Sequence, residues 1–151
     1  SIGVEIQNSG HDNRYENFSK KQIISIKKLL TYLIKEYNVK QKNILGHSDI
    51  SPDRKKDPGE KFPWKELAKS SLSQWHNLDE KKLREKRLIR LNFDEENKFL
   101  INLKKIGYLK ISHKYSNLKK KVIIRAFQRH FRQELINGIS DQECLIISNN
   151  L

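Results

Sequence analysis

The sequence predicts an α/β unit, in which helices flank a central sheet, followed by a small all-α unit of three helices. Two observations support this. Residues 1–47 show a strand, helix and strand pattern, which favours parallel strands joined by a crossover. From residue 94 onward, apolar residues recur at helical spacing in three short segments. We therefore expect one unit at 1–75, a charged linker at 76–93 and a second unit at 94–151.

The first strand is expected at residues 1–6, where small, apolar and acidic residues alternate up to Glu5. A polar loop follows, and Ser19 with Gln22 three residues later predicts the capped start of a helix that ends at Asn38. Residues 39–46 lead into a second strand. The carboxyl ends of both strands, and with them Glu5 and His47, would lie at one edge of the sheet.

Residues 62–72 predict a short helix opened by Pro63. In the second unit, Asp94 is expected to cap a helix that Gly107 ends, Ser116 to cap the next, and Ser140 with Glu143 to open the third. His130, beside Arg129 and Arg132, is expected at the surface or in a groove of the middle helix and not as a metal ligand.

The composition limits the kinds of partner that the protein can bind but does not identify its function. The 151 residues hold 31 Lys and Arg against 18 Asp and Glu, a net charge of +13. A basic surface suits nucleic acid, anionic lipid or an acidic glycopolymer. The single Cys144 excludes an internal disulfide. No apolar run approaches the roughly 18 residues of a membrane span, so we expect no transmembrane segment.

One loop combines residue types that bind metals. His47 follows a short apolar run, and Asp57 lies ten residues later in a loop bounded by Pro52 and Pro58, with Lys55 nearby. Imidazole and carboxylate are ordinary zinc ligands, and a catalytic zinc takes three protein ligands. By spacing alone this is a weak signal, and a loop histidine beside a solvated aspartate explains it better.

The residues around His47 and Asp57 make the assignment of a metal site more specific. The string GHSDISPDRKKDPG at 46–59, followed by Phe62-Pro63-Trp64, resembles the zinc-binding segment of N-acetylmuramoyl-L-alanine amidases of the AmpD/AmiD group. The opening residues SIGVEIQNSG resemble the strand of that family that carries its catalytic glutamate. The resemblance covers about residues 1–69. It implies the later part of a peptidoglycan hydrolase with a mixed central sheet, whose earlier part is absent from this chain.

The resemblance also implies roles for individual residues. His47 and Asp57 would be two of three Zn²⁺ ligands, Glu5 the general base, and Lys55 the group that stabilises the oxyanion. The reaction would split the amide between N-acetylmuramic acid and L-alanine in peptidoglycan or muropeptides. For Lys55, a solvated loop charge remains the alternative.

The third ligand of such a site, a histidine, would lie upstream of Ser1. We expect the preceding part either to accompany this chain as a separate amino-terminal chain or to be missing from the sequence. The remaining alternative is that His11, in the loop after the first strand, takes its place.

The second unit has its own resemblance. Residues 103–108 (LKKIGY), 126–131 (AFQRHF) and Asn137-Gly138 with Asp141 resemble a three-helix peptidoglycan-binding domain that often follows such an amidase. This resemblance implies a wall-binding role for the unit and a location in the bacterial cell envelope, periplasmic or associated with the outer membrane. Two other hypotheses remain: a non-catalytic wall-binding fragment, and a helix-turn-helix protein that binds DNA. We favour the amidase and expect no nucleic-acid partner.

Overall fold

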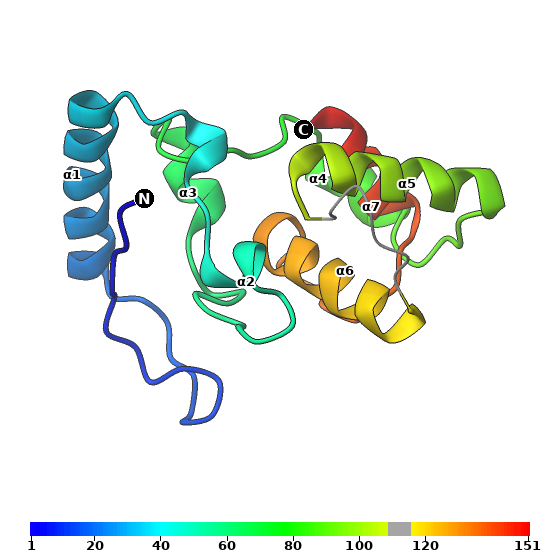
Figure 1. Ribbon diagram of the computed structural model, residues 1–151, viewed down its shortest axis with the longest axis horizontal. Coiled ribbons are helices and arrows are strands. Elements are labelled where there is room, and N and C mark those ends of the chain that lie inside the picture. The colour runs from blue at the N-terminus through cyan, green and yellow to red at the C-terminus, as the bar shows by residue number, and fades with distance from the viewer. Residues whose placement is uncertain (109–115) are drawn as a thin grey trace.

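The computed structural model describes residues 1–108 and 116–151, and its regular elements over these ranges are helices (Figure 1). In chain order they are α1 (Lys20–Tyr37), the short 3-10 helix η1 (Gln41–Asn43), α2 (His47–Ile50), α3 (Trp64–Lys69), α4 (Glu80–Glu85), α5 (Phe93–Ile106), α6 (Asn117–Phe131) and α7 (Gln142–Asn150). Within these ranges, no helix combines the length and the apolarity needed to cross a membrane.

The expected central sheet does not form in the described residues, so the predicted mixed α/β class is wrong for this structure. Residues 1–6 and 39–46 form no strand, and Ile2 and Val4 are 54% and 42% exposed instead of buried. The bridge pairing described here is an isolated contact between Arg90 and Asp141. A strand requires a neighbouring backbone to take up its hydrogen bonds. The alternation of side chains in residues 1–6 does not supply that neighbour.

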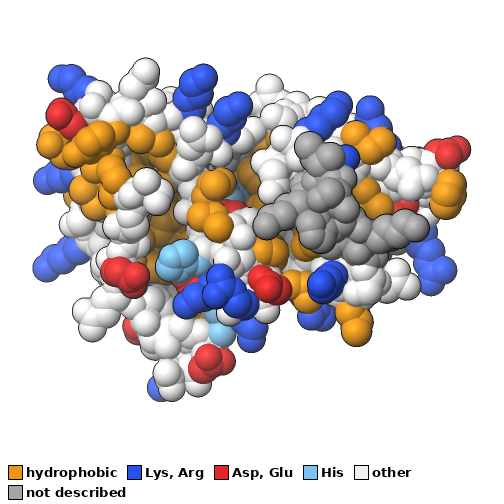
Figure 2. All heavy atoms as spheres, viewed as in Figure 1, with side chains coloured by type: hydrophobic (Ala, Val, Ile, Leu, Met, Phe, Trp, Pro, Cys, Tyr) orange, Lys and Arg blue, Asp and Glu red, His pale blue; other side chains and the backbone are white. Residues whose placement is uncertain are grey.

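Helix α1 confirms its predicted boundaries. The Ser19 hydroxyl accepts from the Gln22 backbone N–H, and the Gln22 side chain accepts from the Ser19 N–H at 2.9 Å. Asn38 ends the helix in the left-handed conformation. Ile26 of α1 is buried, whereas Ile24, Leu29 and Tyr32 are exposed. Apolar side chains gather at the end of the molecule where α1 lies (Figure 2).

The amino-terminal half has its own apolar core, built between α1, α3 and the segments that flank them. Helix α3 begins directly after Pro63, as predicted. Trp75 packs against this core and also against the core of the carboxyl-terminal half, so it joins the two. The buried members of the first core are Phe18, Ile26, Phe62, Trp64, Leu67 and Leu72.

Helices α5, α6 and α7 form the carboxyl-terminal half, as predicted, with two corrected starts. Asn92 caps α5 in place of Asp94, because Asn92 and Glu95 exchange side-chain and backbone hydrogen bonds. Asp141, not Ser140, caps α7 by accepting from the Cys144 N–H. Ser116 caps α6, and Gly107 ends α5 at a φ of 113°. Such a φ favours glycine.

The stretch expected as a linker carries α4, and Leu83 of this helix is buried in the carboxyl-terminal core. Leu88 and Ile89, in the same stretch, are exposed. Phe99, Leu103 and Phe127 are fully buried there. The other buried members of this core are Ile123, Ile124, Phe131, Cys144, Leu145 and Ile147.

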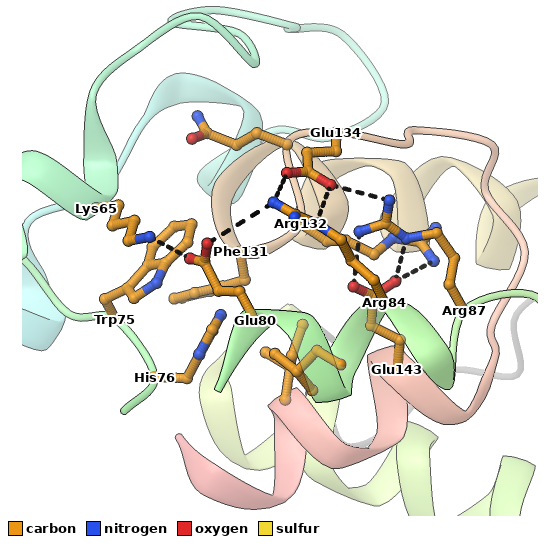
Figure 3. A pocket seen from close by; sticks show the side chains of 13 residues that line it. Lys65, Trp75, His76, Glu80, Arg84, Arg87, Phe131, Arg132, Glu134 and Glu143 are labelled. Carbon is orange, nitrogen blue, oxygen red and sulfur yellow. Dashed lines mark hydrogen bonds and ion pairs between the residues drawn. The ribbon is translucent and has the colours of Figure 1, made fainter. Parts of the chain in front are cut away.

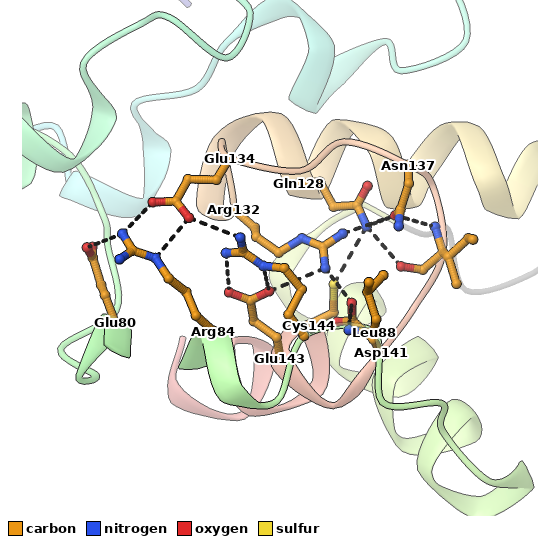
Figure 4. A network of polar contacts seen from close by, with 12 residues as sticks. Glu80, Arg84, Leu88, Gln128, Arg132, Glu134, Asn137, Asp141, Glu143 and Cys144 are labelled. Carbon is orange, nitrogen blue, oxygen red and sulfur yellow. Dashed lines mark hydrogen bonds and ion pairs between the residues drawn. The ribbon is translucent and has the colours of Figure 1, made fainter. Parts of the chain in front are cut away.

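A chain of ion pairs links α4, the end of α6 and the start of α7 (Figure 4). Arg132 bonds the buried Asp141 at 2.5 Å, and Arg87 bonds Glu143 at 2.6 and 2.8 Å. Asp141 also accepts from the Leu88 and Cys144 backbone N–H groups. Arg132, Asp141 and Glu143 are buried, and their pairing is what makes the burial of these charges tolerable.

Candidate metal site

The loop after α2 brings His47 and Asp57 together. His47 is the first residue of α2, and its Nδ1 lies 2.6 Å from Asp57 Oδ2. A backbone bond closes the loop, since the Ser48 N–H donates to the Asp57 carbonyl at 2.9 Å. Both side chains are about half exposed, at 53% and 56%. Two donors of the kinds that zinc prefers therefore meet at a solvent-accessible point.

Tight packing behind the loop fixes its path. A Cβ added to Gly46 would lie 2.5 Å from Pro58 Cδ and 3.3 Å from the Trp64 ring, so only glycine fits there. Trp64 is buried, as expected for a side chain that supports the loop from below. The Asp57–Pro58 peptide bond is cis.

Tyr15 ties the polar amino-terminal loop to the same segment. Its hydroxyl donates to the Pro58 carbonyl at 2.7 Å and accepts from the Lys61 N–H at 3.0 Å. Burial raises the pKa of this hydroxyl to about 12, although the Lys61 hydrogen bond opposes the change. Tyr15 therefore stays protonated and keeps donating to Pro58 at neutral pH.

His11 has another partner than the candidate site. Its Nε2 lies 2.9 Å from Glu60 Oε2, and its ring stacks on Tyr15 with centroids 4.4 Å apart. Burial alone would raise the pKa of Glu60, but the hydrogen bond and charge of His11 lower it below its usual value. Over residues 1–108 and 116–151, no three His, Cys, Asp or Glu side chains group closely enough to hold a metal.

Glu5 and Lys55 do not join the pair. Both side chains are exposed, and within the described ranges no hydrogen bond or ion pair connects either side chain to His47 or Asp57. The Lys55 backbone N–H donates to the Ser51 carbonyl at 2.9 Å, which places Lys55 in the turn between the two candidate ligands. The roles of Glu5 and Lys55 therefore rest on the sequence resemblance.

Asp49, two residues after His47, is a site neighbour that the sequence reasoning missed. Its carboxylate is buried and accepts from the Gly46 N–H at 2.8 Å and from the Tyr108 hydroxyl at 2.5 Å. His130 Nδ1 lies 2.8 Å from the same carboxylate. Burial alone would raise the pKa of Asp49, but the charge and hydrogen bond of His130, with those from Tyr108 and Gly46, hold it below its usual value.

The expectation that His130 lies at the surface or in a groove is wrong, because its ring is 2% exposed and packed inside the protein. The signal was present in the sequence. His130 follows Ile123 by seven residues, Ala126 by four and Phe127 by three, which places it on the apolar face of α6.

A separate hollow of about 270 Å³ lies between α3, α4, α7 and the end of α6 (Figure 3). Trp75 and His76 form one wall, and the Lys65–Glu80 ion pair crosses its rim. Neither His47 nor Asp57 lines it. Its charged side chains pair largely with one another, so we assign it no ligand.

The sequence is similar to known N-acetylmuramoyl-L-alanine amidases. Residues 1–60 match a family model described as N-acetylmuramoyl-L-alanine amidase. The whole chain is 30% identical to N-acetylmuramoyl-L-alanine amidase AmiD of Escherichia coli K12 and covers 56% of it. It is 35% identical to 1,6-anhydro-N-acetylmuramyl-L-alanine amidase AmpD of Haemophilus influenzae over 71 residues, which are 46% of this chain and 36% of that protein.

Two solved structures of similar proteins superpose on most of this chain. Escherichia coli AmiD, in a complex with the substrate anhydro-N-acetylmuramic acid-L-Ala-D-γ-Glu-L-Lys, superposes with a TM-score of 0.77 at 30% identity, over 92% of this chain and 54% of that one. AmpDH3 of Pseudomonas aeruginosa gives 0.75 at 29% identity, over 91% and 54%.

The chain spans about half the length of AmiD and AmpDH3. Nothing in these similarities supports the expectation of a separate amino-terminal chain. Residues 1–60 match the N-acetylmuramoyl-L-alanine amidase family, and the chain as a whole is similar to AmpD/AmiD-type amidases.

Proposed function

We propose that this chain belongs to an enzyme that hydrolyses the amide between N-acetylmuramic acid and L-alanine in peptidoglycan or muropeptides, with zinc as cofactor. The observation that carries the proposal is the contact of His47 Nδ1 and Asp57 Oδ2 at 2.6 Å, within the segment that the amidase family model matches. The anhydromuropeptide bound to AmiD supports the substrate class.

His47 and Asp57 would hold the metal together with a third protein ligand, which the described residues do not place beside them. Zinc, when bound, acidifies a water molecule and polarises the substrate carbonyl. Glu5 would accept the proton of that water and return it to the leaving amine of L-alanine. Lys55, on the turn between the two ligands, would stabilise the negative charge that develops on the carbonyl oxygen.

The two halves would divide the work. In this proposal residues 1–75 carry the catalytic part, 76–93 connect the halves, and 94–151 hold peptidoglycan as a three-helix wall-binding unit. The protein would then act in the bacterial cell envelope, in the periplasm or at the outer membrane. The likeness over 92% of this chain to AmiD, which includes this unit, supports a shared arrangement.

Purified peptidoglycan incubated with zinc and with the whole enzyme to which this chain belongs, followed by mass spectrometry, tests the proposal. We expect stem peptides that begin with a free L-alanine amino group. Glu5→Gln should abolish their release, and Glu16→Gln, a change of another exposed glutamate, should leave it intact. Release that persists in Glu5→Gln would overturn the assigned role of Glu5.

A second candidate is a wall-binding fragment without catalysis. The observation that favours it is that no third metal-binding side chain lies with His47 and Asp57 in the described parts of the chain. Protein that sediments with the wall but releases no stem peptide would support this candidate over the first.

A further inference from the structure

The buried Asp49 connects the two halves directly beside the candidate metal site. Its Oδ2 accepts from the Gly46 N–H at 2.8 Å, and this bond closes the start of α2. Tyr108, which follows α5, and His130, on α6, reach the same carboxylate at 2.5 and 2.8 Å. Two of the three partners of Asp49 therefore come from the carboxyl-terminal half.

His130 is held in one orientation. Its ring stacks on Trp64 with centroids 3.9 Å apart and planes at 14°, and on Phe131 at 4.1 Å and 13°. Among residues 1–108 and 116–151, its buried Nε2 has no hydrogen-bond partner. Within the same ranges Asp49 is the one polar partner of this ring, and an unpartnered buried nitrogen is costly unless another contact outweighs it.

Helix α2 depends on such contacts for its shape. It has four residues, too few for a helix to persist in water without tertiary support. It lies against α6 (Figure 1). His47 opens α2, so the contacts of Asp49 act on the same short helix that carries the imidazole of His47.

We propose that Tyr108 and His130 are positioning residues for the candidate zinc site: they hold Asp49, and through it the short helix that carries His47. This inference rests on the proposed function. It makes the carboxyl-terminal half part of the frame of the site, in addition to any binding of the wall.

The alternative is that these contacts only dock one half on the other. Another contact across the same junction provides the matched control. Gln133 Nε2 donates to the Phe62 carbonyl at 2.7 Å and makes no hydrogen bond to α2. Gln133→Ala weakens the junction and leaves Asp49 untouched.

The experiment compares the full chain with Tyr108→Phe, His130→Ala, His130→Asn and Gln133→Ala. Hydrogen exchange of the Gly46 amide, measured by NMR, reports on the bond to Asp49. Zinc affinity, measured by competition with a chromophoric chelator, reports on His47. We expect Tyr108→Phe and His130→Ala to speed the exchange about tenfold and to weaken zinc binding by about 10- to 100-fold. His130→Asn keeps a donor near the position of Nδ1, so its Gly46 exchange rate and its zinc affinity should lie closer to those of the parent. Gln133→Ala should change neither the exchange rate nor the zinc affinity.

Unchanged Gly46 exchange in Tyr108→Phe and His130→Ala, with melting temperatures that fall as in Gln133→Ala, would overturn the positioning role. The two proposals fail separately. A parent chain that binds no zinc would show that His47 and Asp57 do not hold the metal by themselves, and the Gly46 amide would still decide whether Tyr108 and His130 hold α2.

Discussion

Single hydrogen bonds hold the candidate site in place, and Tyr15 offers the clearest test. Replacing Tyr15 with Phe removes one oxygen and leaves the Pro58 carbonyl and the Lys61 N–H without their partner. We expect the free energy of unfolding to fall by about 1–2 kcal/mol, which lowers the melting temperature by several degrees. Scanning calorimetry measures the change.

Tyr37→Phe is the control for this prediction, because Tyr37 is 59% exposed at the end of α1. It should leave the melting temperature unchanged. Equal melting temperatures for the parent and Tyr15→Phe would show that Tyr15 does not restrain the loop of Asp57.

At the same scale, sequence and structure differ in an instructive way. The resemblance selected His47 and Asp57, and the structure places them in contact. Asp49 and Tyr108 escaped attention because their contact joins residues 59 positions apart, which no local pattern reveals. His130 was misplaced for a different reason: neighbouring arginines suggested a surface, although its helical spacing pointed inward.

Among the helices, caps differ strongly in how much they stabilise. Asp79 caps α4 from an exposed position, whereas Asp141 caps α7 from a buried one and also pairs with Arg132. Asp79→Ala should cost about 1 kcal/mol. Asp141→Ala should cost about 3–5 kcal/mol, because it leaves the buried Arg132 without its closest partner.

Urea unfolding of the two variants checks this pair of predictions. Asp141→Asn separates the two contributions of Asp141, since it keeps a cap and loses the charge. Equal losses in Asp79→Ala and Asp141→Ala would contradict the view that the ion pairs of Figure 4 make Asp141 special.

Helices were predictable where local signals determine them. Ser19 with Gln22, and Gly107, mark boundaries that depend on a few neighbouring residues. The expected strands depend on distant backbone partners, and within the described residues those partners are absent for residues 1–6 and 39–46. The predicted N-caps of α5 and α7 were wrong by two residues and by one residue, and Asn92 and Asp141 cap these helices instead. Several adjacent polar side chains can cap a helix, so the sequence does not select one of them.

At the scale of the whole molecule, the junction between the halves should respond to pH through His76. This side chain lines the hollow beside Trp75. Burial lowers the pKa of His76 below its usual 6.5, although the charge of Glu80 opposes the change. Below about pH 6.5 the unfolded chain therefore binds more protons at His76 than the folded chain does. The stability that the neutral, buried His76 allows the folded chain is therefore present above about pH 6.5 and is lost as the pH falls.

We expect the melting temperature of the parent to fall more steeply between about pH 7 and pH 5.5 than that of His76→Gln. Thermal unfolding at several pH values measures both slopes. Identical slopes for the parent and His76→Gln would contradict the assignment.

The central claim is that His47 and Asp57 bind one metal ion, and zinc titration of the full chain tests it most directly. We predict one zinc per chain, with binding at least about 100-fold weaker in His47→Ala and Asp57→Ala because each loses a direct ligand. Asp53→Ala, which changes another exposed aspartate of the same loop, should bind as the parent does. Equal zinc affinity in all four proteins would contradict the claim.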